Sequence, residues 1–181
     1  MQTNLPDGAV HFYGDSLFDS MSISDVHSFG VNFAIGGESM RALLNRINQS
    51  SIHRAGACVL LTGINDLANT SYYPSFQNAA DTVIYMHQHQ LEPAMTGKWV
   101  VVKILPVVDG ICTVPNWAVN AVNSFMQTKY GNRQNTVLVD VTAQLAPQGQ
   151  LAYHIGDGVH LNAGGYAILK SAISSALTTL L

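Results

Sequence analysis

The chain has 181 residues, of which 48% are hydrophobic and only 10% are charged, and its formal net charge is -3. This size favours a single domain over residues 1–181, large enough to bury a full core and still carry a cleft. The sparse, slightly negative charge provides no basic stripe for phosphate groups, so nucleic acid is not an expected partner.

The sequence also gives no sign of a leader or a membrane span. Residues 1–6 lack a positive region followed by an apolar stretch, and no later apolar run is long enough to cross a bilayer. We expect a soluble protein without stable membrane insertion, either cytoplasmic as written or the mature form of a secreted or periplasmic protein. The oligomeric state is left open.

Short apolar runs rich in β-branched residues predict five buried strands, each flanked by Gly, Pro or polar residues. The predicted strands are residues 9–13, 30–35, 57–61, 100–105 and 136–141. Helical periodicity predicts helices over residues 39–47, 76–91, 117–129 and 163–180, the last capped by Asn162. Strands that alternate with helices predict an α/β protein with a parallel sheet covered on both faces. Residues 146–158 form the longest irregular stretch, and long loops are often functional.

Neither the cysteines nor the histidines predict a metal or redox site. Cys58 and Cys112 are the only cysteines, and we expect two unrelated thiols rather than a disulfide. His87 and His89 lie two apart on a predicted helix and so point to different faces. Four other histidines have no ligand spacing with a Cys or carboxylate partner: His11, His27, His53 and His154. His160 is discussed below. We therefore expect neither a metal nor another cofactor.

Four short blocks fall near predicted strand ends or in the loop after the last strand, where the chemistry of α/β sheets gathers. In chain order the blocks are Gly14-Asp15-Ser16-Leu17, Ile35-Gly36-Gly37-Glu38, Gly63-Ile64-Asn65-Asp66 and Asp157-Gly158-Val159-His160. Together they resemble the GDSL or SGNH hydrolase family. The resemblance runs from the first strand to the last helix, and it implies a three-layer α/β/α sandwich around a five-stranded, flavodoxin-like parallel sheet. It also implies a serine esterase.

The resemblance gives each block a role. Ser16 is expected to be the nucleophile, because a serine hydroxyl near a base can attack a carbonyl carbon. His160 is expected to be the base, with Asp157 orienting its ring. The backbone N–H groups of Ser16 and Gly37 and the amide of Asn65 are expected to bind the oxyanion.

Each role has a structural alternative. Ser16 could simply cap a helix, and Asp157 and Asn65 could be turn residues. Gly36 is an alternative oxyanion donor to Gly37. Asp15 is expected to bond nearby backbone amides rather than carry a proton.

Apolar side chains near the same sheet edge predict a shallow substrate cleft. The candidate substrate contacts are Leu17, Phe18, Tyr72, Tyr73, Ile111 and Trp117, although each could instead pack beneath a loop. A small-molecule ester of a short acyl chain is the expected substrate, with thioesters as a further class. A carbohydrate O-acetylesterase is the alternative activity, and a non-catalytic binding module is the alternative from another class.

Overall fold

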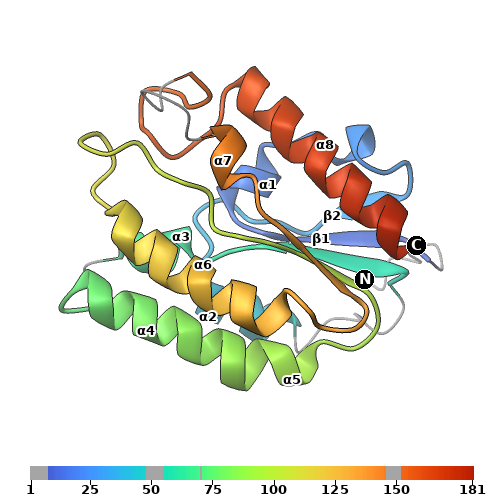
Figure 1. Cartoon of the computed structure of the whole chain (residues 1–181), viewed down its shortest axis with the longest axis horizontal. Helices are drawn as coiled ribbons and strands as arrows, with labels where there is room; N and C mark the ends of the chain where they lie inside the picture. The colour runs from blue at the N-terminus through green and yellow to red at the C-terminus, as the bar shows by residue number, and fades with distance from the viewer. Residues whose placement is uncertain (1–7, 48–54, 70, 146–151) are drawn as a thin grey trace.

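A five-stranded parallel sheet forms the centre of the computed structural model, which describes residues 8–47, 55–69, 71–145 and 152–181 (Figure 1). The strand order is β2-β1-β3-β4-β5, and every neighbouring pair is parallel. The strands are β1 (Val10–Gly14), β2 (Gly30–Asn32), β3 (Ala57–Leu61), β4 (Trp99–Val102) and β5 (Thr136–Val139). The expected α/β fold with a five-stranded parallel sheet is therefore confirmed.

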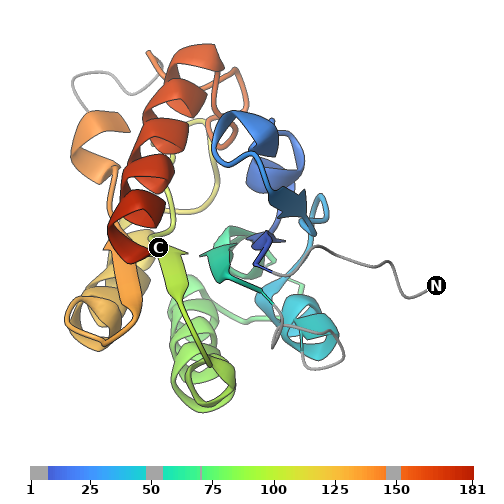
Figure 2. The same cartoon turned by 90° about the vertical axis from the view of Figure 1, so that its right-hand side faces the viewer.

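Helices cover both faces of this sheet (Figure 2). The longer helices are α2 (Met40–Ile47), α4 (Phe76–Met86), α6 (Asn116–Tyr130) and α8 (Ala163–Leu180). The shorter helical segments are α1 (Ser16–Asp19), η1 (Ile23–Asp25), α3 (Ile64–Ala68), η3 (His87–Leu91), α5 (Glu92–Ala94) and α7 (Thr142–Leu145). Helices α2, α4 and α6 pack on one face, whereas α1 and α8 pack on the other.

The strands supply both halves of the core because successive side chains point to opposite faces. In β1, Phe12 joins the cluster under α1 and α8, and Tyr13 joins the cluster under α2, α4 and α6. In β4, Val100 and Val101 divide in the same way. A strand buried on both faces is largely apolar, which is why these runs show no regular polar alternation; His11 is a buried polar residue in β1.

Three predicted strands were too long at their C-terminal ends, because β2 ends at Asn32, β4 at Val102 and β5 at Val139. After β4 the chain stays buried but leaves the sheet. The Asn123 side chain of α6 accepts a hydrogen bond from Ile104 N at 2.9 Å and donates one to Ile104 O at 2.8 Å. The Asn123 carboxamide thus satisfies the backbone groups of Ile104 that a neighbouring strand would otherwise bond. Strand propensity along the sequence does not reveal this contact, so the predicted strand was too long.

The helix predicted over residues 76–91 is interrupted. Helix α4 ends at Met86, and the chain continues as the π-helical turn η3. The predicted cap of α8 is confirmed, since the Asn162 side chain accepts hydrogen bonds from Gly164 N and Gly165 N. The predicted loop over residues 146–158 is described only from residue 152; residues 146–151 lie outside the described residues.

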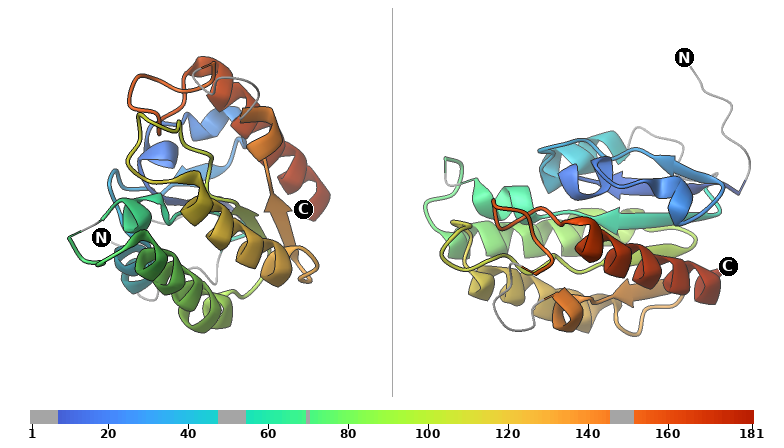
Figure 3. Two further views of the ribbon diagram at one scale, coloured as in Figure 1. Left: turned by 60° about the vertical axis from the view of Figure 1, so that its left-hand side comes forward. Right: turned by 90° about the horizontal axis from the view of Figure 1, so that it is seen from above.

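The loops at the carboxyl edge of the sheet gather at one end of the molecule. Helix α3, the loop after β4 and the loop that precedes α8 lie together at the left of Figure 1 and again in both views of Figure 3. Parallel strands force this arrangement, because all their C-termini reach the same edge. No helix of the described residues is long and apolar enough to cross a membrane.

Candidate active site

Ser16 lies at the turn where β1 passes directly into α1, and it is half-buried. Asp15 caps this helix, because its Oδ1 accepts a hydrogen bond from Leu17 N at 3.0 Å. Strands β1 and β3 approach closely at this point, since a Cβ added at Gly14 would lie 2.5 Å from Leu61 O. Helix capping by Asp15 therefore leaves the Ser16 hydroxyl free for other partners.

His160 lies between Ser16 and Asp157. Its Nε2 is 2.7 Å from Ser16 Oγ, and its Nδ1 is 2.6 Å from Asp157 Oδ2. Hydrogen bonds thus connect Ser16, His160 and Asp157, although Ser16 and His160 are 144 residues apart in the sequence. Asp157 and His160 meet through a turn, because Asp157 Oδ1 also accepts hydrogen bonds from Val159 N and His160 N, each at 2.9 Å.

The loop that carries Asp157 and His160 is held from both sides. A β-bridge joins His154 to Leu161, and Ile155 N donates to His160 O at 2.9 Å. The buried ring of His154 lies with its Nε2 2.9 Å from Pro106 O, in the segment that follows β4. The sequence showed only that His154 lacks the spacing of a metal ligand, whereas in the structure its side chain anchors the His160 loop.

The two carboxyl groups near Ser16 have different electrostatic environments. Partial burial acts to raise the pKa of Asp157, but the hydrogen bonds from Val159 N, His160 N and the His160 ring outweigh it, and the pKa is lowered. Burial raises the pKa of Asp15 to about 6, even though the Leu17 hydrogen bond and the His160 charge oppose this shift. Asp157 is therefore the carboxylate that stays ionised beside His160.

Asn65 is hydrogen-bonded to the loop that carries Gly37. Glu38 N donates to Ile35 O in a turn, and Gly37 occupies it with a φ of +76°, a conformation that favours glycine. Asn65 Nδ2 donates to Glu38 O at 3.1 Å. A carboxamide nitrogen carries two hydrogens, so this bond orients the Asn65 side chain and leaves its second N–H available.

Two of the predicted substrate contacts were wrong. Leu17 and Phe18 are 1% and 0% exposed, and both pack in the core under α1 and α8. After Ser16 the chain forms helix α1, whose apolar side chains turn inward. The apolar spacing of Leu17, Phe18 and Met21 was the available signal, since all three are buried.

The other predicted contacts remain accessible. Tyr72 and Tyr73 line a cavity of about 420 Å³. Ile111 is 44% exposed, and its side chain lies 3.2 Å from where a Cβ on Gly158 would be, so it adjoins the His160 loop. Trp117 is exposed on the first turn of α6.

Cys58 and Cys112 are free, as expected. The described residues contain no group of three or more metal-ligating side chains. His53 lies outside the described residues.

Comparison with known proteins assigns the family. Residues 8–168 match the model of the GDSL-like Lipase/Acylhydrolase family. This chain belongs to that family. The GDSL-like family is one of lipases and acylhydrolases, so hydrolysis of an ester bond is the activity supported at family level. No curated protein sequence matches the chain.

Solved structures share the fold of this GDSL-like protein at low sequence identity. A lipase/acylhydrolase from Enterococcus faecalis is 16% identical with a TM-score of 0.79, over 95% of this chain and 96% of that one. The C-terminal catalytic domain of a peptidoglycan O-acetyltransferase from Streptococcus pneumoniae is 12% identical, with a TM-score of 0.73 and coverage of 96% and 94%. An acetylxylan esterase from Geobacillus stearothermophilus is 17% identical, with a TM-score of 0.63 and coverage of 94% and 95%.

Proposed function

We propose that this protein is a serine hydrolase that cleaves carboxylic esters of short acyl chains through an acyl-Ser16 intermediate. One observation carries the proposal: His160 contacts both Ser16 Oγ at 2.7 Å and Asp157 Oδ2 at 2.6 Å, which is the arrangement needed for proton transfer. A helix-capping serine or a turn-forming aspartate would not require an imidazole between them. Both distances lie within hydrogen-bond reach, which is the first criterion for a catalytic base.

In this mechanism His160 Nε2 takes the proton from Ser16 Oγ as the oxygen attacks the acyl carbon. The imidazolium then gives this proton to the departing alcohol, and an acyl-enzyme remains. Water attacks the acyl carbon in the second half, again with His160 as base, and Ser16 is regenerated. Asp157 holds the ring with Nδ1–H toward the carboxylate and stabilises the imidazolium, which requires that Asp157 be ionised.

The tetrahedral intermediates carry a negative oxygen that needs hydrogen-bond donors. We assign these donors to Ser16 N, Gly37 N and the second N–H of Asn65. The hydrogen bond from Asn65 to Glu38 O supports the assignment, because it fixes the amide next to the turn that holds Gly37. Donors fixed in advance need no reorganisation when charge develops, and one such donor is commonly worth about 3 kcal/mol.

A carbohydrate O-acetylesterase is a second candidate within the same chemistry. Two tyrosines and two asparagines line the cavity beside the proposed oxyanion site, and aromatic rings with carboxamides suit a sugar. The acetylxylan esterase of similar fold acts on an acetylated polysaccharide, but at 17% identity it indicates the fold alone. Acetate release from acetylated xylan, compared with hydrolysis of 4-nitrophenyl acetate, separates the two candidates.

The test of the proposed function is hydrolysis of 4-nitrophenyl acetate and butyrate by wild type and Ser16→Ala. The change removes the nucleophile and little packing, so hydrolysis should fall to the rate without enzyme while the circular dichroism spectrum stays unchanged. Ser28→Ala, at an exposed serine, is the matched control and should keep wild-type activity. Full activity in Ser16→Ala, or no activity in folded wild type, would overturn the proposal.

A further inference from the structure

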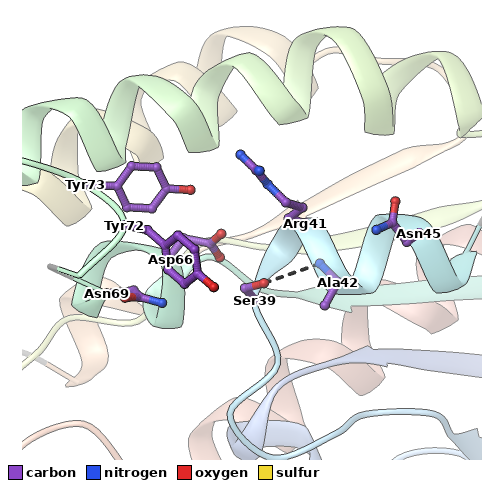
Figure 4. A pocket seen from close by; sticks show the side chains of 8 residues that line it. All are labelled: Ser39, Arg41, Ala42, Asn45, Asp66, Asn69, Tyr72 and Tyr73. Atoms are coloured by element: carbon purple, nitrogen blue, oxygen red, sulfur yellow. Dashed lines mark hydrogen bonds between the residues drawn. The ribbon is translucent and has the colours of Figure 1, made fainter.

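A cavity of about 420 Å³ lies between α2, α3 and the segment that follows α3 (Figure 4). Its walls are polar and aromatic, with Arg41 and Asn45 from α2 and Asn69, Tyr72 and Tyr73 from the other side. The Tyr73 hydroxyl points toward the Arg41 guanidinium across the cavity. A hollow of this size is large enough for a small ligand group.

Arg41 brings a positive charge to this cavity, where its side chain interacts electrostatically with the Asp66 carboxylate and with the Tyr73 hydroxyl. Seven of the eight Lys and Arg residues are described, and five of these form salt bridges. Arg41 forms none with any described carboxylate. Its nearest acidic neighbour in sequence, Glu38, is instead held by Arg46 through two hydrogen bonds of 3.0 and 2.6 Å. A guanidinium that no described carboxylate holds in a salt bridge, at the wall of a cavity, is suited to bind a planar anion.

Asp66 is the acidic group that faces the same cavity, and it limits where an anion can bind. It is 2% exposed, and its Oδ2 accepts a hydrogen bond from Met40 N at 2.7 Å, at the start of α2. A ligand anion beside Asp66 would be repelled by this carboxylate, which lies at the start of α2. An anion can therefore bind only to the part of the Arg41 guanidinium that faces away from Asp66, with the Tyr73 hydroxyl and the Asn45 amide as further donors.

The cavity adjoins the residues that we propose to bind the oxyanion. Its wall includes Ser39, which lies within about 8 Å of Gly37 because it is two residues away. Its wall also includes Asp66, the neighbour of Asn65. His160 approaches from the loop before α8, which covers the opposite face of the sheet. Since His160 must protonate the departing alcohol, the alcohol lies beside His160, which leaves the cavity next to the oxyanion donors for the acyl substituent.

We propose that this cavity is an acyl-binding subsite in which Arg41 binds a carboxylate at the far end of the acyl group. The favoured substrates are then monoesters of short dicarboxylic acids, such as succinate. This inference rests on the proposed function. The reaction remains hydrolysis: water adds across the acyl–oxygen bond, and one alcohol and one dicarboxylate are released.

The test compares monoethyl succinate with ethyl butyrate, whose acyl groups have the same number of carbons, in a pH-stat assay. We expect the ratio of their kcat/KM values to fall at least about tenfold in Arg41→Gln, because a charge-assisted hydrogen bond is lost. Arg41→Lys should retain part of the preference. Lys98→Gln removes a positive charge elsewhere, and its ratio should equal that of wild type. An unchanged ratio in Arg41→Gln would overturn the subsite while leaving the proposed function intact.

Two further measurements separate the remaining outcomes. In the second pair, 3-acetoxypropanoate carries its carboxylate on the alcohol portion, and propyl acetate is its uncharged analogue. If Arg41→Gln lost the preference for the charged ester in this pair alone, the assignment of Arg41 to the acyl side would be overturned. Succinate binding, followed by calorimetry, does not depend on turnover and should weaken at least about tenfold in Arg41→Gln. If no ester is hydrolysed but succinate binding depends on Arg41, the subsite stands and the proposed function fails; if binding is unaffected, the subsite fails as well.

Discussion

The buried imidazole of His87 should make the stability of this protein fall in acid. The His87 side chain is 0% exposed at the junction of α4 and η3, and its Nδ1 lies 3.1 Å from the Tyr130 hydroxyl. Its Nε2 has no hydrogen-bond partner among the described residues. Burial lowers the pKa of His87 from 6.5 to about 4, because the charged imidazolium would lose its hydration.

The direction and size of the effect follow from this lowered pKa. Between pH 6.5 and 4 the unfolded chain binds a proton at His87 that the folded protein does not bind, so stability present above pH 6.5 is lost as the pH falls. One pKa unit corresponds to about 1.4 kcal/mol, so the loss at pH 4 amounts to about 3 kcal/mol. Asp15 acts in the opposite sense, since its pKa is raised to about 6 and the folded protein binds the extra proton there.

Comparison with His87→Phe separates the effect of His87 on stability from that of Asp15. This variant keeps Asp15 and a buried ring, but it has no titrating imidazole. We would measure the free energy of unfolding by urea denaturation at pH 7, 6, 5 and 4. Relative to His87→Phe, wild type should lose about 3 kcal/mol between pH 7 and 4. His89→Gln, at an exposed histidine two residues away, is the control and should follow wild type. Parallel curves for wild type and His87→Phe would refute the reasoning.

Four further predictions concern the site. His160→Ala should reduce kcat to nearly the level of Ser16→Ala, whereas Asp157→Asn should retain more activity; steady-state kinetics of both variants test this order, and near-wild-type activity in His160→Ala would contradict it. Asn65→Ala should lower kcat roughly 100-fold or more with little change in KM, and a raised KM at constant kcat would place Asn65 in ground-state binding. Gly63→Ala should lower the urea midpoint, because φ is +115° there and the added Cβ would lie 2.8 Å from Ile104 Cδ1; an unchanged midpoint would show that the strain is relieved. Across 4-nitrophenyl esters from acetate to palmitate, kcat/KM should rise over the first few carbons and then level off, because each methylene gains up to about 0.8 kcal/mol only while it touches apolar wall; an optimum at long chains would indicate a deeper cleft.

Predictions from the sequence were most accurate for the elements whose structure has one dominant physical cause. Strand 57–61 and helix 163–180 were placed correctly because continuous burial and a long amphipathic period leave few alternatives. Ser16, His160 and the other blocks came together because parallel strands all end at one edge, so order along the chain is enough to predict their proximity.

The sequence was least informative where a contact between distant residues determines the local structure. The end of β4 depends on the Asn123 carboxamide, 19 residues further along, which bonds both backbone groups of Ile104. Arg41 was missed for a similar reason. An arginine in the first turn of a helix is common and gives no sign of a binding site. Only the fold shows that Glu38 accepts hydrogen bonds from Arg46 and that the Tyr73 hydroxyl points toward the Arg41 guanidinium.

Covalent labelling of Ser16 is the measurement that tests the central claim most directly. A fluorophosphonate reacts with a serine only when a neighbouring base activates the hydroxyl, and the modified peptide is identified by mass spectrometry. We expect one adduct per chain, located on Ser16, which forms much more slowly in His160→Ala and is absent in Ser16→Ala. Folded wild-type protein that remains unmodified, or that is modified at another serine, would contradict the assignment of Ser16 as the nucleophile.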